Sequence, residues 1–505
     1  MTAAARLRRL AKSDAGVLAG IAVLDLLLHV ATNGQYGFHR DELATVDDAR
    51  RLAWGYVAYP PLAPAVARMA LLLFGPSLRG LRFFAALAAS VAVALTGSIA
   101  RALGARRGGQ VAAALAAAIG PTCLAAGALF QYVAFDFLWW TVAAWAVANL
   151  VSSGDRRWWL VVGAALGAGA ETKYTIAFCA AGIAAGTLAE RRGDVSSKWP
   201  WLGAALAILL AAPNALWQAR HGFVSLEFLR SIHARDVEIG RTAGFLADQL
   251  TDAANLVTIP LWAAGLAFLL AAPPRKGARM LAWMAIVPFL LFWAAHGRGY
   301  YTAPIYPPLL ASGAVFWERR VAAMTAGRRA AAVAAAAILF VAGSSVAVAT
   351  LPIAPIGSRL WRFAVRQNGD FVEEVGWPEL VREVARIHRA LPPEDRARTA
   401  ILAGNYGEAG AVDLYGPPLG LPPAISGVNS YWARGPGDPP PEVVIALGLD
   451  RDYLERKFAS CVLAGSMPAP YGVENEETTR HRGIFVCRRL RTSWPEFWRT
   501  FRHFG

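Results

Sequence analysis

The chain has 505 residues, of which 56% are hydrophobic and 17% charged, and its mean hydropathy is +0.38. Soluble proteins carry roughly 25% charged residues, so this composition excludes one large soluble core and indicates a polytopic membrane protein. The net charge of +15 would suit nucleic-acid binding. Most Lys and Arg residues outside the C-terminal third instead flank apolar segments, where such residues set membrane topology.

Eleven apolar segments are long enough to be membrane spans, each of roughly 17–25 residues. They cover residues 15–33, 80–100, 109–127, 132–151, 157–171, 174–189, 200–217, 254–271, 280–296, 300–317 and 329–349. The fifth and sixth are short and nearly continuous through Glu171-Thr172-Lys173. The pattern predicts a transmembrane domain over residues 1–350.

The basic residues predict the orientation of these segments. With the N-terminus in the cytoplasm, the inside loops carry nineteen Lys and Arg residues, whereas the short outside loops carry only Lys173 and Arg298. The inside residues are Arg6, Arg8, Arg9, Lys12, Arg101, Arg106, Arg107, Arg156, Arg157, Arg191, Arg192, Lys198, Arg275, Lys276, Arg279, Arg319, Arg320, Arg328 and Arg329. This asymmetry follows the positive-inside rule, and eleven spans then place the C-terminal region outside.

An acidic cluster follows the first apolar segment. It comprises His39-Arg40-Asp41-Glu42 and Asp47-Asp48, and the turn Tyr59-Pro60-Pro61 comes next. Charges at a membrane surface are costly to desolvate, so Asp41 and Glu42 can supply a base, bind a metal or cap a helix. The alternative is a solvated helix start. Residues 42–54, and a second stretch over residues 226–235, read as amphipathic helices at the interface.

The composition changes near residue 351, where prolines, glycines and charges become more frequent. Helical patterns over 377–390 and 450–458, with strand-like runs at 399–403, 443–447 and 483–488, predict a small soluble α/β domain over residues 351–505. Three glycines after the first run, Gly404, Gly407 and Gly410, are spaced GxxGxxG. This spacing favours a tight strand-to-helix turn over a dinucleotide site.

The four cysteines have no spacing typical of a zinc site. Cys123 and Cys179 fall in apolar runs. Cys461 and Cys487 lie at predicted strands of the outer domain, so they either form a disulfide or Cys461 is simply buried.

Further polar residues recur at the predicted outer ends of spans. They are Asp136, Lys173, Asn214, Gln218, His221, Arg298, Tyr300 and Tyr301. Acids and cations on one face suit a reaction on a lipid-linked anion, since cations hold phosphate and a carboxylate can take a proton from a hydroxyl. Lys173 and Arg298 could instead anchor the chain at the membrane interface. The stretch from Asn214 to Gln218 is equally well explained as the end of a helix. Asp136 is costly beside aromatic residues unless it lines a cavity.

Several blocks of the sequence together resemble a known family. They are Phe38-His39-Arg40-Asp41-Glu42-Leu43, Trp54-Gly55-Tyr56-Val57, Tyr59-Pro60-Pro61-Leu62, Phe135-Asp136, Thr172-Lys173-Tyr174, Pro213-Asn214, Trp217-Gln218, Tyr300-Tyr301, Ala303-Pro304, Tyr306-Pro307, Leu402 to Gly410 and Ser430-Tyr431-Trp432. They resemble bacterial members of glycosyltransferase family 39. These are relatives of the protein O-mannosyltransferases and of the aminoarabinose transferase of lipid A, in the GT-C superfamily. The resemblance covers nearly the whole chain.

The resemblance implies a GT-C fold of about eleven transmembrane helices with outer-face interfacial helices, in the bacterial cytoplasmic membrane. It implies an inverting transfer, on the outer face, from a polyprenyl-phosphate sugar to a lipid, glycan or protein hydroxyl. Asp41 then corresponds to the base, and Glu42 and Asp136 to its supporting acids. A divalent cation near these three carboxylates is compatible with the family.

The same resemblance implies the substrate contacts. Lys173 and Arg298 are expected at the donor phosphate. Tyr59, Asn214, Gln218, His221, Tyr300 and Tyr301 are expected at the substrates. Tyr59 stands where the aminoarabinose transferase has Lys, which argues against that substrate, and the β-trefoil of the eukaryotic mannosyltransferases is absent, which argues against protein acceptors.

The competing interpretation is a transporter or lipid-carrier flippase without covalent chemistry. A transporter more often places its ionisable residues at mid-membrane, on broken helices within an inverted repeat. Here these residues gather on one predicted face and no internal repeat is visible, so the sequence favours an enzyme.

Overall fold

The computed structural model describes residues 13–271 and 277–505. The predicted inside residues Arg6, Arg8, Arg9 and Lys12, and the pair Arg275-Lys276, lie outside these ranges. The described chain forms two compact units, each made of three separate stretches. The helical unit comprises the described residues up to Asn33, with Arg82–Gly222 and His233–Leu351. The mixed unit comprises Gly34–Leu81, Phe223–Ile232 and Pro352–Gly505.

The helical unit follows the predicted apolar segments closely. Its main helices are α2 (Asp14–Thr32), α5 (Leu78–Ala102), α6 (Arg107–Ala118), α7 (Pro121–Ala128), α8 (Tyr132–Ser153), α9 (Trp158–Ala170), α10 (Ile176–Glu190), α11 (Arg192–Val195), α12 (Lys198–Arg220), α14 (Phe245–Thr251), η1 (Leu256–Thr258), α15 (Ile259–Ala271), α16 (Met280–Ala294), η2 (Gly299–Ile305), α17 (Tyr306–Ala322), α18 (Ala326–Ser344) and α19 (Ala347–Thr350). Each of the eleven predicted segments falls on helical structure.

Fewer helices are long enough to cross a membrane unaided. Among the described residues, five helices have the required length and apolarity, or seven if each bent pair is one span. The bent pairs are α6 with α7, at 63°, and α14 with the segment Leu256–Ala271, at 85°. Helix α9 has 13 residues, which span about 20 Å of a hydrocarbon core roughly 30 Å thick. The count of eleven spans therefore stays a prediction, while the predicted helical architecture, with several helices long and apolar enough to cross a membrane, is confirmed.

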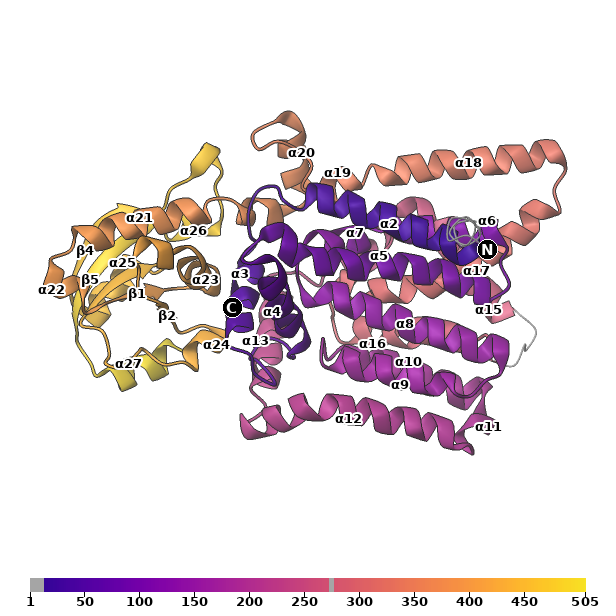
Figure 1. Cartoon of the computed structure of the whole chain (residues 1–505), viewed down its shortest axis with the longest axis horizontal. Helices are drawn as coiled ribbons and strands as arrows, with labels where there is room; N and C mark the ends of the chain where they lie inside the picture. The colour runs from indigo at the N-terminus through magenta and orange to yellow at the C-terminus, as the bar shows by residue number, and fades with distance from the viewer. Residues whose placement is uncertain (1–12, 272–276) are drawn as a thin grey trace, which may run out of the picture. The chain divides into compact units, whose positions relative to one another are not determined.

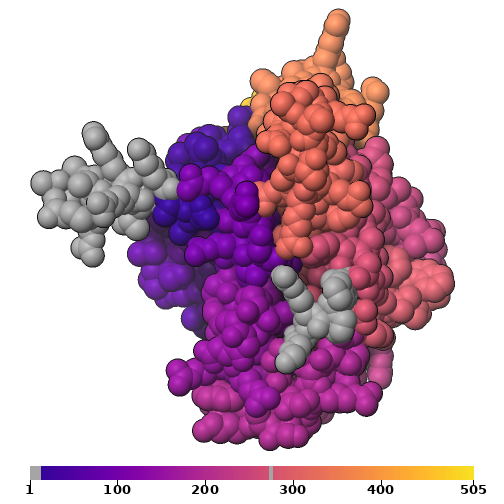
Figure 2. Space-filling view, turned by 90° about the vertical axis from the view of Figure 1, so that its right-hand side faces the viewer, coloured from indigo at the N-terminus to yellow at the C-terminus, as the bar shows by residue number. Residues whose placement is uncertain are grey.

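Small residues let the helices of this unit approach closely. A Cβ atom at Gly163 of α9 would collide with the backbone of Gly203 on α12, and one at Gly265 of α15 with the carbonyl oxygen of Leu309 on α17. Such contacts are typical of membrane helices, where close packing replaces the hydrophobic effect. Figure 2 looks along these helices, and the salmon-coloured segment that includes α18 lies at the surface of the unit.

The mixed unit contains a five-stranded sheet in the order β2-β1-β3-β5-β4. The strands are β1 (Thr399–Ala403), β2 (Ala424–Ser426), β3 (Val443–Leu447), β4 (Phe458–Ser466) and β5 (Gly483–Leu490). β1 pairs in parallel with β2 and β3, and β5 pairs antiparallel with β3 and β4. Figure 1 shows α21 (Trp377–Ala390) and α27 (Trp494–Phe501) on opposite sides of this sheet. The predicted small C-terminal α/β fold is confirmed.

Two predicted strands, 399–403 and 443–447, have the bounds that the sequence indicates, and the third extends to Leu490. β2 and β4 were not predicted, because β2 has three residues and β4 is rich in Ala, Ser and Gly. Helix α25 (Arg451–Lys457) ends where β4 begins. Cys461 and Cys487 face each other across β4 and β5 and form a disulfide.

Short helices complete the mixed unit. α3 (Arg40–Arg50) begins earlier and ends earlier than the predicted 42–54 helix, and α13 (Val224–Glu238) includes the predicted 226–235 stretch. After the Pro60-Pro61 turn the chain enters an apolar helix, α4 (Leu62–Phe74), that the sequence analysis missed. The remaining elements include α20 (Arg359–Gln367), η3 (Gly369–Glu374), α22 (Pro393–Arg396), α23 (Tyr406–Tyr415), η4 (Pro417–Leu419), α24 (Asn429–Trp432), η5 (Pro470–Gly472) and α26 (Glu476–Arg480).

Candidate active site

The start of α3 is fixed by a capping box. His39 is the N-cap, and its Nδ1 accepts a hydrogen bond of 3.2 Å from the backbone N–H of Asp41. Glu42 is fully buried, and its Oε2 accepts a 2.9 Å bond from the backbone N–H of His39. These reciprocal bonds satisfy donors that a helix start leaves open. The carboxylate of Glu42 therefore helps to begin the helix, and the cap is His39 rather than Asp41.

Asp41 is in a different environment from its neighbour. Its side chain is 39% exposed, and its Oδ1 accepts a 2.8 Å hydrogen bond from the hydroxyl of Tyr406. Tyr406 is the first residue of α23 and lies within the GxxGxxG stretch, which makes the strand-to-helix turn that the sequence predicts. Tyr406 lies in the block Leu402 to Gly410 that carries the family resemblance, but it was not among the predicted site residues.

The other charges of α3 are engaged within the mixed unit. Arg40 forms ion pairs with Glu373 at 2.8 Å, with Glu476 at 2.7 Å and with Glu477 at 2.5 Å. Its guanidinium is largely enclosed, with 16% of the side chain exposed. Arg40 therefore ties the start of α3 to the C-terminal stretch of the same unit.

The second acidic pair is buried around one arginine. Arg434 pairs with Asp47, and its Nη2 lies 2.9 Å from Oδ1 of Asp48. The hydroxyl of Tyr59 donates a 2.8 Å bond to Oδ2 of Asp48. Burial raises the pKa of Asp48 to about 7, although Arg434 opposes the shift. Tyr59, expected at a substrate, here helps to satisfy a buried carboxyl, and the sequence analysis missed Arg434.

A different cluster lies in the helical unit. Asp136, near the start of α8, is buried, and its Oδ1 accepts a 3.0 Å bond from the indole N–H of Trp140. Nζ of Lys173, between α9 and α10, lies 3.8 Å from Oδ2 of Asp136. Only 12% of the lysine side chain is exposed. Cation and acid are thus close but not tightly joined.

Three tyrosine rings surround this lysine. Its Nζ lies 4.0 Å from the ring centroid of Tyr301, 5.5 Å from that of Tyr132 and 5.7 Å from that of Tyr300. Aromatic faces attract a cation at such distances. Asp136, Lys173, Tyr300 and Tyr301 were predicted from separate parts of the sequence, and the structure brings them together. Tyr132 was not predicted.

Asn214 and Gln218 form a separate network with Tyr174. The hydroxyl of Tyr174 donates a 2.9 Å bond to Oδ1 of Asn214 and accepts a 3.1 Å bond from Nε2 of Gln218. Since Tyr174 follows Lys173 in the chain, this network connects α12 to the lysine segment. His221 is exposed at the end of α12, stacks on Trp217 and hydrogen-bonds to its carbonyl oxygen at 2.8 Å.

Arg298 differs from Lys173 in how closely its side chain is paired with a carboxylate. Its Nε lies 2.7 Å and its Nη2 2.5 Å from Oδ2 of Asp236. These two close contacts hold the guanidinium in place, although Asp236 also lies 3.8 Å from Arg235 and 3.9 Å from Arg241, so one carboxylate serves three arginines. Of the two predicted phosphate-binding cations, Lys173 is therefore the one held more loosely.

No metal centre is evident in the part of the chain that the structure describes. Residues 13–271 and 277–505 contain no group of three or more His, Cys, Asp or Glu side chains that could hold a metal ion.

Comparison with known protein sequences gives a match to a family model. A sequence model of the family described as dolichyl-phosphate-mannose-protein mannosyltransferase matches residues 58–217. No curated protein sequence matches the chain.

Solved structures match much more of the chain. ArnT from Cupriavidus metallidurans in the apo state has a TM-score of 0.55 at 16% identity, over 93% of this chain and 97% of ArnT. The same protein bound to undecaprenyl phosphate gives 0.54 at 16% identity, with the same coverage. The oligosaccharyltransferase of Archaeoglobus fulgidus, tethered to an acceptor peptide, gives 0.50 at 11% identity, over 81% of this chain and 64% of that one. The family model thus supports the predicted resemblance over residues 58–217, and the solved structures show a fold that the chain shares with ArnT.

Proposed function

We propose that this GT-C protein is an inverting glycosyltransferase of the bacterial cytoplasmic membrane. It moves a hexose or pentose from a polyprenyl-phosphate donor to a hydroxyl of a lipid, glycan or protein on the outer face. The fold shared with ArnT supports this proposal, because one of the two ArnT structures is bound to undecaprenyl phosphate.

The observation that carries the proposal is the lysine cluster of the helical unit. Lys173 is nearly enclosed, is surrounded by the rings of Tyr132, Tyr300 and Tyr301, and lies 3.8 Å from its acidic neighbour Asp136. A lipid phosphate that leaves with the electrons of the glycosidic bond needs a nearby cation more than a proton. In a site with little water, one lysine stabilises such an anion strongly.

We assign the base to Asp41. Among the carboxylates of α3, Glu42, Asp47 and Asp48 are buried and bonded within the unit, whereas Asp41 has 39% of its side chain exposed. Asp41 accepts the proton of the acceptor hydroxyl as the acceptor oxygen bonds to the anomeric carbon. The bond from that carbon to the phosphate oxygen breaks, and polyprenyl phosphate leaves with the electron pair. One direct displacement inverts the anomeric centre.

Two features of the mixed unit support the proposed orientation. Residues 34–81, 223–232 and 352–505 form this one unit, so they share a side of the membrane. Six predicted spans lie between residues 34–81 and 223–232, and four lie between residues 223–232 and 352–505. An even number of spans returns the chain to the same side of the membrane, so both counts agree with this requirement. The Cys461–Cys487 disulfide is typical of an oxidising compartment.

Reporter fusions test this topology. Fusions at Arg156 and Arg275 should report the cytoplasm, and a fusion at Gly505 should report the exterior. A cytoplasmic signal at Gly505 would contradict this topology.

The reaction itself is tested with purified chain in lipid vesicles. A polyprenyl-phosphate donor with a radiolabelled sugar is supplied with a panel of hydroxyl acceptors. We expect label in an acceptor, with polyprenyl phosphate released in equal amount and the anomeric configuration inverted. Movement of the intact donor between leaflets, with no transfer to any acceptor, would instead support the flippase and refute the enzyme.

A further inference from the structure

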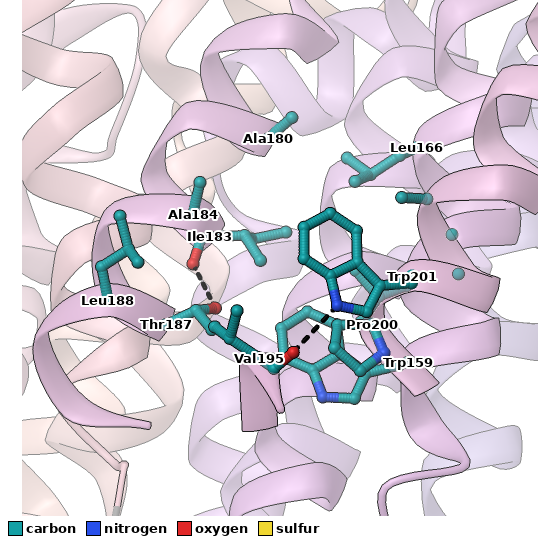
Figure 3. Close-up of a pocket in the computed structure, with 14 residues that line it drawn as sticks. Trp159, Leu166, Ala180, Ile183, Ala184, Thr187, Leu188, Val195, Pro200 and Trp201 are labelled. Carbon is teal, nitrogen blue, oxygen red and sulfur yellow. Dashed lines mark hydrogen bonds between the residues drawn. The ribbon is translucent and has the colours of Figure 1, made fainter. Parts of the chain in front are cut away.

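A groove in the helical unit lies apart from the lysine cluster. Helices α9, α10 and α12 enclose a cavity of about 280 Å³ (Figure 3). Its lining is almost wholly apolar and includes Trp159, Leu166, Ile183, Ala184, Leu188 and Trp201. Leu188 and Trp201 are 57% and 62% exposed, so the groove opens onto the surface of the unit.

One end of the groove is closed by the short helix α11. The indole N–H of Trp201 donates a 2.8 Å hydrogen bond to the carbonyl oxygen of Val195, and that of Trp159 a 3.3 Å bond to Oδ2 of Asp194. The hydroxyl of Thr187 donates to the carbonyl oxygen of Ile183 at 2.7 Å, so it is satisfied within its own helix (Figure 3). These polar groups are occupied, and the groove suits a hydrocarbon chain.

Basic side chains gather at this closed end. Arg156 and Arg191 pair with Asp194 at 3.0 and 2.7 Å, and Nε of Arg192 donates to the carbonyl oxygen of Leu188. Residues 155–157 and 190–198 hold five cations (Arg156, Arg157, Arg191, Arg192 and Lys198) against three carboxylates (Asp155, Glu190 and Asp194). The excess positive charge therefore lies where the apolar groove ends.

We propose that this groove binds one anionic phospholipid. An acyl chain occupies the space between α10 and α12, and the phosphate lies near Arg156, Arg192 and Lys198. An apolar channel ending in a basic pocket between membrane helices matches the two parts of such a lipid. The predicted topology places these loops in the cytoplasm, so the lipid comes from the inner leaflet. This site is independent of the proposed transferase reaction.

Native mass spectrometry of the full chain in detergent tests the site. The delipidated protein is titrated with phosphatidylglycerol and with phosphatidylcholine carrying the same acyl chains. We expect one phosphatidylglycerol to be retained at least tenfold more tightly. Combining R156Q, R192Q and K198Q should abolish this preference, whereas R319Q, R320Q and R329Q together, at another basic loop, should leave it unchanged.

A second variant tests the apolar part. Ala184→Phe fills the groove and should reduce retention of the phospholipid, whereas Ala334→Phe on the exposed surface of α18 should not. Equal retention of the two lipids, or a preference that survives the triple substitution at the groove, would refute the basic pocket. Several equivalent lipids unaffected by Ala184→Phe would indicate an ordinary lipid layer. Displacement of the bound lipid by polyprenyl phosphate would show that the groove holds a donor chain instead.

Discussion

The two charged clusters differ in how their charges are compensated. In the helical unit a single lysine meets one carboxylate, Asp136, at 3.8 Å, and tyrosine rings form the rest of its surroundings. In the mixed unit four carboxylates lie along one short helix, but the pair Asp47 and Asp48 is bound by Arg434. Asp41 is the partly exposed one of these four carboxylates, with 39% of its side chain exposed, and it accepts a hydrogen bond from the hydroxyl of Tyr406.

From this difference we infer which of the charged residues take part in the proposed reaction. Asp47 and Asp48 hold α3 to the C-terminal stretch through Arg434. Breaking such a buried pair would leave an uncompensated charge. An enclosed side chain whose charge is only loosely paired, such as Lys173, can still bind an anionic ligand. The comparison predicts large kinetic effects at Asp41 and Lys173, and mainly structural effects at their neighbours.

The largest effect is expected from Asp41→Asn. Asparagine keeps the shape of the side chain but cannot take a proton, so the transfer rate should fall by on the order of 10²–10⁴-fold. The variant should still insert and bind donor, as measured by single-turnover transfer and by donor binding. Turnover near that of the wild type would move the base to Glu42 or Asp136.

Glu42→Gln is the matched control for Asp41→Asn. Glutamine can accept the same hydrogen bond from the backbone N–H of His39, so Glu42→Gln should keep the capping box and change stability little. The rate per folded molecule should change far less than in Asp41→Asn. A rate loss as large as that of Asp41→Asn, without loss of stability, would show that both acids take part in the chemistry.

The next effect is expected on donor binding in Lys173→Met. Loss of a charge-assisted contact should weaken polyprenyl-phosphate binding by about 1.5–3 kcal/mol, or about 10–150-fold in Kd. Arg298→Ala should weaken it less, because Asp236 already holds that guanidinium. Lys457→Met, which removes a lysine 5.7 Å from the ring of Tyr453, is a control that should leave Kd unchanged. Unchanged affinity in both variants would reduce Lys173 and Arg298 to topology anchors.

A smaller effect is expected from Tyr406→Phe. This change removes the hydroxyl that donates to Asp41 and leaves the ring, so the carboxylate should adopt its working orientation less often. A loss of about 1 kcal/mol corresponds to roughly a fivefold lower kcat, with donor Kd unchanged. Tyr471→Phe, at an 80% exposed position, is the control. A wild-type kcat in Tyr406→Phe would show that other contacts position Asp41.

The sequence predicts those features that depend on neighbouring residues. Apolar runs identify the helices, and the GxxGxxG stretch identifies the turn before α23. Local sequence patterns cannot identify Tyr406 as a partner of Asp41, which lies 365 residues earlier. Nor can they identify Arg434 as a partner of Asp48, which lies 386 residues earlier. Such contacts depend on how the C-terminal stretch packs with residues 34–81. β4 was missed for a related reason, because its pairing with β5 compensates for weak strand-forming residues.

A separate effect, on stability rather than on activity, concerns the buried carboxyl of Glu408 in the mixed unit. Its Oε2 accepts hydrogen bonds from the backbone N–H groups of Gly404 and Asn405 at 3.0 and 3.2 Å. Within the described chain its Oε1 has no hydrogen-bond partner. Burial, reinforced by the charge of Glu477, raises the pKa of Glu408 from 4.5 to about 8. The folded protein therefore binds more protons than the unfolded chain between these two values.

The free energy of unfolding should consequently fall as the pH rises from about 4.5 to about 8. Glu408→Gln has no charge to acquire, so its stability should depend less on pH. A shallower dependence should remain, because burial also raises the pKa of Glu477 to about 7. Thermal unfolding of the detergent-solubilised protein between pH 5 and pH 9 measures both slopes. Parallel slopes for the two proteins would show that Glu408 ionises as readily in the folded state as in the unfolded one.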